Sequence, residues 1–185
     1  MNKSNLLKTA AALALLAATS VFAQAVNSNT SDVTLNASVG ESLTVTINSG
    51  NTVNFGQLTP GSSATTNVGD VAISITTAWN LISPTSNSVK LYAYFSTPVQ
   101  AMANGTSYIP ASDIYATVNS GIAAALNGSF AVGTPLDSTT ITSGNLQGTM
   151  NDSVTLGIDL TGFTNMNLPA GNYTGTLHIQ AQAAS

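Results

Sequence analysis

Apolar and polar residues alternate along the C-terminal stretch 168–183, which carries the clearest periodic pattern in the chain. Proline, glycine and asparagine within residues 169–172 predict a turn, because these residues suit restricted or positive φ angles. After the turn, Leu177 and Ile179 fall on one face and His178 falls on the other. A period of two predicts a half-buried β-strand. We expect this strand to pair with segments that are distant in the sequence.

Similar alternation predicts most of the other strands. Strands are expected over residues 32–39, 43–47, 71–79, 89–95, 114–118 and 154–160. Glycine, proline and asparagine supply turn signals between them, and the Asn-Gly pair at 127–128 predicts a hairpin. Residues 122–126 fit either a short strand or a single helical turn, because periodicity cannot decide at that length. Residues 133–150 are rich in Gly, Ser and Thr and show only two isolated apolar anchors, Ile141 and Leu146.

No stretch beyond the N-terminal region has the pattern of an amphipathic helix, and no internal repeat of fixed period is present. Roughly eight to ten short strands separated by turn signals favour an all-β fold. We therefore predict an antiparallel β-sandwich of the immunoglobulin-like type, with a closed β-barrel as the alternative.

The N-terminal region has the pattern of a secretory signal peptide. Lys3 and Lys8 form a positive start, and residues 10–18 are an apolar run of alanine and leucine that is too short to span a bilayer. Small residues then offer cleavage after Ala23 or Ala25. We predict a signal peptide over 1–23, with 25 as the alternative boundary, and no membrane insertion after its removal.

A flexible polar leader (24–31) and a single domain (32–185) are predicted to follow. Removal of the two N-terminal lysines lowers the formal net charge from -4 to -6 and leaves Lys90 as the remaining basic side chain besides His178. A phosphate backbone requires several cations, so this composition excludes nucleic acid and anionic lipid as partners. Disorder is excluded as well, because 43% of the residues are hydrophobic and 5% are charged.

Candidate catalytic groups are sparse. His178 is the one histidine, there is no cysteine, and a solvated strand residue is therefore expected instead of a zinc ligand or triad member. Asp152 and Asp159 flank a predicted strand on opposite faces, and we expect them to cap turns and face solvent. A carboxylate pair for glycoside hydrolysis would have to converge in space, which no spacing indicates. We predict no catalytic residue, no metal site and no cofactor, hence no enzyme.

Three aromatic residues invite comparison with a sugar-binding platform. Trp79 shares the parity of the apolar positions before it, which predicts core packing. Tyr92 and Tyr94 lie opposite the apolar face of their strand, so they are candidates for ligand contact or for covering the second side of a sandwich. Lys90 shares their outward parity, and this argues against an internal Lys–Asn crosslink.

Three stretches together resemble the spore coat U-like pilins of archaic chaperone–usher systems. DVTLNASVG (32–40) is similar to their N-terminal donor segment, an alternating strand closed by glycine. VNFGQLTP (53–60) is similar to their apolar-x-Phe-Gly-x-x-x-Pro stretch, and AGNYTGTL (170–177) to their closing Gly-x-Tyr strand. Residues 80–165 show no such match, and Glu41 stands where these subunits often have a cysteine. The resemblance implies an incomplete sandwich that is completed by the N-terminal strand of the next subunit.

The resulting functional hypothesis is a secreted structural subunit of an extracellular fibre, pilus-like or surface assembly, joined by β-strand complementation. Strands that lack guarding charges support it, because soluble sheet proteins usually protect their edges with such charges. The candidate donor residues are Val33, Leu35, Ala37 and Val39. Whether this strand pairs within its own chain or with another stays open at this level.

Partners implied by the resemblance are copies of the chain or related subunits, with a periplasmic chaperone and usher. The implied location is the extracellular space or cell surface of a bacterium, reached through the periplasm. The alternative function is a monomeric secreted adhesin or carbohydrate-binding β-sandwich module.

Overall fold

The structure is a computed structural model that describes residues 33–82, 88–126, 128–164 and 167–184. The predicted signal peptide and leader lie outside the described residues, as does Asn127 of the predicted hairpin. The compact unit is Val39–Ser185, and residues 33–38 belong to a separate unit. The fold is described below for the compact unit.

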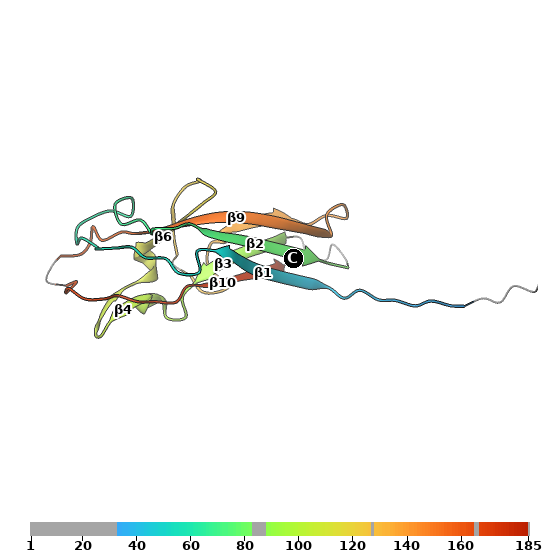
Figure 1. The fold of residues 1–185 in the computed structure, drawn as a ribbon, viewed down its shortest axis with the longest axis horizontal. Helices are drawn as coiled ribbons and strands as arrows, with labels where there is room; N and C mark the ends of the chain where they lie inside the picture. The colour runs from blue at the N-terminus through green and yellow to red at the C-terminus, as the bar shows by residue number, and fades with distance from the viewer. Residues whose placement is uncertain (1–32, 83–87, 127, 165–166, 185) are drawn as a thin grey trace, which may run out of the picture. The chain divides into compact units, whose positions relative to one another are not determined.

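The described residues of the compact unit form ten strands, and all of the pairings between them are antiparallel. One sheet contains, in spatial order, β1 (Ser42–Ser49), β2 (Ile73–Asn80), β9 (Gln147–Ile158), β6 (Ile114–Val118) and β7 (Ala124–Ala125). A second sheet contains β10 (His178–Ala184), β3 (Ser88–Tyr94) and β8 (Asp137–Thr140). A small hairpin pairs β4 (Met102–Asn104) with β5 (Ser107–Ile109), and two 3₁₀ turns, η1 (Pro98–Gln100) and η2 (Ala111–Asp113), flank it. The predicted all-β, antiparallel sandwich is confirmed (Figure 1).

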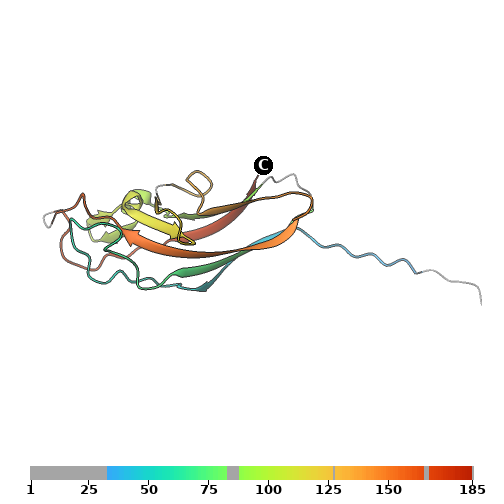
Figure 2. The same cartoon turned by 90° about the horizontal axis from the view of Figure 1, so that it is seen from above.

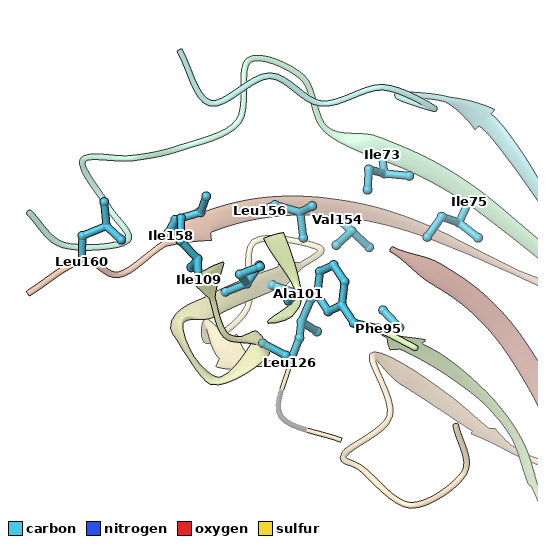
Figure 3. Close-up of a cluster of buried hydrophobic side chains, with 14 of the residues drawn as sticks. Ile73, Ile75, Phe95, Ala101, Ile109, Leu126, Val154, Leu156, Ile158 and Leu160 are labelled. Atoms are coloured by element: carbon cyan, nitrogen blue, oxygen red, sulfur yellow. The ribbon is translucent and has the colours of Figure 1, made fainter. Parts of the chain in front are cut away.

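The core forms where the inward faces of the two sheets meet. Every second residue of β2 is buried from Ile73 to Trp79, and β3 buries Val89 and Leu91 in the same way. The C-terminal half of β9 adds the buried side chains that lie at the centre of the close-up in Figure 3, among them Val154, Leu156 and Ile158. The period of two in the sequence thus produces one apolar face on each sheet.

The longest strand, β9, runs beside β2 for most of its length (Figure 2). It begins at Gln147, seven residues before the predicted strand, and β8 lies within the same Gly/Ser/Thr-rich region 133–150. The sequence pattern did not predict either extension. These two segments are strands because they pair with β3 and β2, and not because their side chains alternate. The ambiguous stretch 122–126 contains a strand, β7, and no helical turn.

The last strand is shorter than its pattern predicted. β10 begins at His178, and the residues from Tyr173 to Leu177 form only an isolated bridge between Thr174 and Ala103. The predicted parity is nevertheless confirmed, because Leu177 packs against the core whereas the His178 ring stacks on Tyr94 at the outer face. Within the described residues, no helix has the length and hydropathy to cross a membrane.

The core assignment makes a test of stability possible with two chemically identical substitutions. Ile114 of β6 is 1% exposed and Ile82 is 70% exposed. Ile114→Ala is expected to lower the free energy of unfolding by about 2–5 kcal/mol, since it leaves a cavity in the core. Ile82→Ala should change it by less than about 0.5 kcal/mol. Equal losses in urea denaturation would contradict the placement of Ile114.

Candidate functional site

The most distinctive feature of the compact unit is an apolar groove that is open to solvent. It consists of two adjoining hollows of about 320 and 1080 Å³. One wall is the segment that follows β1, residues 50–60, and the other is the segment that leads into β10, residues 168–177. Thr52, Val53, Phe55, Met102 and Gly175 line both hollows, which makes the groove continuous.

The floor and the walls of the groove differ in burial. The floor belongs to the core, since Phe95, Ile114 and Leu156 are all buried. The apolar wall residues are packed against this core yet are only half-buried; they are Val53, Phe55, Leu58, Met102, Tyr173, Leu177 and Ile179. Apolar side chains that contact the core and still meet solvent form an apolar surface along this side of the sandwich.

The first wall is fixed by a clamp between Asn54 and Asp70. The Asn54 N–H and side-chain amide donate to the Asp70 carboxylate at 2.8 and 3.1 Å, and the Asp70 N–H donates to the Asn54 carbonyl at 2.8 Å. The Asn54 backbone N–H, followed by its side-chain amide, holds the pKa of Asp70 below its ordinary value. Both backbone groups of Asn54 are therefore used by this clamp. The neighbouring residues Val53 and Phe55 line both hollows and make no backbone hydrogen bond to another described residue.

The second wall repeats this arrangement. Thr174 exchanges two backbone hydrogen bonds with Ala103 of β4, at 2.9 and 3.1 Å. In an extended chain the N–H and C=O groups of the neighbouring residues, Tyr173 and Gly175, lie along the opposite edge, and both residues line the groove. Neither residue makes a backbone hydrogen bond to another described residue. The groove is thus flanked by two free backbone edges as well as floored by apolar side chains.

A close approach of backbones holds the second wall in place. A Cβ atom on Gly175 would collide with the carbonyl oxygen of Ala101, so the absence of a side chain allows 168–177 to lie against the segment before β4. Tyr173 adds an anchor within the wall, because its hydroxyl donates to the Pro169 carbonyl at 2.9 Å.

The candidate donor residues belong to a segment without regular structure. Residues 33–41 form no strand, and the side chains of Val33, Leu35 and Val39 are strongly exposed, with Leu35 at 89%. None of the strand pairings among the described residues includes these alternating side chains. The prediction of a strand over 32–39 is therefore wrong for the described residues 33–39, and the first strand begins at Ser42.

The two tyrosines proposed for ligand contact have different surroundings. Tyr92 is only 5% exposed, because Phe130 covers it in an edge-to-face contact with ring centroids 5.7 Å apart. Tyr94 is half-buried, and its ring stacks on that of His178 with the ring centroids 5.3 Å apart. The Tyr94 hydroxyl donates a hydrogen bond to Gln180 Oε1 at 3.0 Å. Tyr92 thus offers almost no surface to a ligand, and the rings on this face are largely occupied by one another.

Among the polar candidates, the prediction for Asp152 was wrong. Asp152 is buried inside β9 and is not a solvated turn residue, because the strand begins further upstream than its pattern indicated. Asp159 is half-buried and caps a turn, where the Thr161 N–H holds the pKa of the carboxyl below its ordinary value. His178 lies on the outer face, as expected, and its Nε2 is hydrogen-bonded to the Ser96 hydroxyl at 2.9 Å. In the described part of the chain, His and acidic residues form no group of three that could hold a metal ion.

The sequence analysis did not identify the groove as a site. Its walls coincide with two of the stretches that carry the pilin resemblance, 53–60 and 170–177. Met102 and the floor residues had no recognisable signal, because their convergence depends on the tertiary arrangement. No family model, no curated protein and no solved structure matches this chain.

The close approach at Gly175 predicts a specific sensitivity of the groove wall. Gly175→Ala should lower the free energy of unfolding by about 1–3 kcal/mol, because the added methyl group meets backbone that cannot rotate away. Gly162→Ala is the matched control, since nothing lies within 4 Å of a Cβ at that position. Urea denaturation of both variants measures the difference. Similar stability of the two variants would mean that 168–177 is not pressed against Ala101.

Proposed function

We propose that this protein is a secreted structural subunit of an extracellular fibre or surface assembly, and that its subunits are joined by β-strand complementation. The observation that carries the proposal is the groove, in which an apolar floor lies between two free backbone edges. An extended strand laid between these edges could hydrogen-bond to both of them while its alternate side chains cover the floor.

The N-terminal segment has the properties that such a groove requires of its occupant. Val33, Leu35, Ala37 and Val39 would supply one apolar face, and residues 33–40 carry no charge. The residues that line the groove are also uncharged. An uncharged donor therefore enters without leaving an unpaired ion in a region of low dielectric constant.

Chain length favours complementation between subunits over closure within one chain. The N-terminal segment joins β1 at Ser42, which pairs with Asn80, and Glu41 is fixed there by accepting a 2.9 Å hydrogen bond from the Ile82 N–H. The groove begins at the opposite end of β1, near Ile47 and Gly50. Residues 33–39, folded back, would span roughly 23 Å, whereas β1 alone spans roughly 26 Å. The segment would be used up along β1 before it reached the wall residues beyond Gly50.

The remaining parts of the proposal follow from the same assignment. A subunit that is exported with an uncovered groove needs protection before assembly, which is the role expected of a periplasmic chaperone and usher. The bacterial cell surface or extracellular space is the destination. The role is structural, and we expect no reaction that depends on His178, Asp152 or Asp159.

Donor binding can be tested with a truncated subunit. Deletion of residues 24–39 from the mature protein should leave a soluble, unpolymerised and less stable subunit, because the groove then has no donor. A synthetic peptide of residues 32–40 should bind it in isothermal titration calorimetry and raise its melting temperature. The same peptide with Leu35→Asp should not bind, since it would bury a charge against the apolar floor.

The groove side of the contact has its own matched pair of variants. Ile47 lines the groove and is 44% exposed, so Ile47→Asp should abolish peptide binding without unfolding the subunit. Ile82→Asp makes the same change at an exposed position that does not line the groove and should leave binding intact. Full-length mature protein should polymerise. If it stays monomeric at high concentration, even after mild denaturant, the self-contained adhesin or carbohydrate-binding module is the correct function instead.

A further inference from the structure

A buried carboxyl group lies between the two sheets, apart from the groove. Asp152 occupies the inward face of β9, opposite Ile75 of β2, and is 3% exposed. Its Oδ1 accepts a 3.0 Å hydrogen bond from the side-chain amide of Asn119, at the turn after β6. Its Oδ2 is buried and has no donor among the described residues. An unpartnered carboxylate oxygen in an apolar interior is costly, so this atom calls for an explanation.

The second sheet directs another carboxyl group toward it. Asp137 of β8 lies opposite Leu91 in the register, and Leu91 is fully buried, so the Asp137 side chain also points between the sheets. It lies within hydrogen-bonding reach of Asp152. Two ionised carboxylates at this distance repel one another, whereas a carboxyl and a carboxylate form a short, strong hydrogen bond.

No cation compensates the pair from the elements packed around it. β2 contributes Ile75 and Thr77, the turn after β6 contributes Asn119, and β3 contributes Leu91. Lys90 belongs to the outer face of β3, between Ser138 and Gln182. Among the described residues, the only charged group that acts on Asp152 is therefore Asp137.

We propose that Asp137 and Asp152 hold one proton between them, and that this shared proton ties the two sheets together across the interior. The proton provides the donor that Asp152 Oδ2 lacks. Its loss leaves two negative charges facing each other across the sandwich, and the contact between β8 and β9 loosens. The pair thus makes the stability of the sandwich depend on pH, and this dependence does not involve the groove.

The direction of this dependence follows from the environment of Asp152. Burial, followed by the hydrogen bond and charge of Asp137, raises the pKa of Asp152 from 3.8 to about 6. The folded protein therefore binds a proton more tightly than the unfolded chain does. The stabilisation is fully present below about pH 4 and is lost as the pH rises through about 6. The folding equilibrium constant should fall by at most on the order of a hundredfold across this range.

Full-length mature protein and two isosteric variants test the proposal by urea denaturation at about pH 4.5 and about pH 7.5. The wild-type midpoint should be lower at the higher pH. In Asp152→Asn and Asp137→Asn, the urea midpoint should change little between the two pH values. At the higher pH it should lie above the wild-type midpoint, because an amide supplies the missing donor without a charge. Asp159→Asn is the control, because it changes an acidic residue directly after β9, and its urea midpoint should decrease with pH as in the wild type. An unchanged fall in Asp152→Asn would overturn the proposal.

A direct measurement covers the case in which a variant does not fold. Carbon-13 NMR of the wild-type carboxyl carbons should show an Asp152 titration with a midpoint near pH 6. An ordinary aspartate titration of Asp152 would refute the shared proton. Calcium chloride in millimolar excess should leave the wild-type midpoint at about pH 7.5 unchanged. A rise that is absent in Asp152→Asn would show that the pair holds a cation and not a proton.

Discussion

Apolar contact between β9, β2 and β3 is the interaction on which the rest of the structure depends. The chain has no cysteine and only 5% charged residues, so neither disulfides nor ion-pair networks can hold the sheets together. β2 and β9 are far apart in sequence, and so are β3 and its partner β10, so each of these pairings closes a long loop at an entropic cost. The burial of alternate side chains from both sheets has to offset that cost. A side of the sandwich without its covering strand is therefore exposed apolar core.

The groove is the place where this requirement is not met by the compact unit alone. β1 and β10 are edge strands of their sheets, and the chain that extends from each of them runs along the opening without pairing across it. Leu177 and Ile179 have the parity of core residues and contact the core, yet they stay half-buried. One added strand would complete the burial of these side chains. This incomplete burial is the feature on which the proposed strand complementation rests.

Local pattern predicted the all-β class, the parity of β2, β3 and β10 and the core position of Trp79, since a period of two reports directly on one buried face. The same reasoning placed Asp152 in solvent and the region 133–150 outside the strands. Both errors share a cause, because β8 and the first half of β9 carry polar residues that only pairing with β3 and β2 makes strand-like. The groove was beyond local reasoning, because Met102 and Phe55 meet only through the tertiary arrangement.

Free edges on a sandwich with few charged residues would ordinarily favour indiscriminate aggregation. A strand that paired with a single edge would satisfy one row of backbone groups and leave the half-buried walls of the groove in contact with solvent. A strand between the Val53 and Gly175 edges would satisfy two rows at once and would also cover the half-buried side chains of Phe55 and Met102. Register is strongly set in that position, because a slip of one residue would turn the apolar side chains of the donor away from the floor. Under the proposed function, the same features that make the isolated chain prone to aggregation would select for one extended, alternating and uncharged partner.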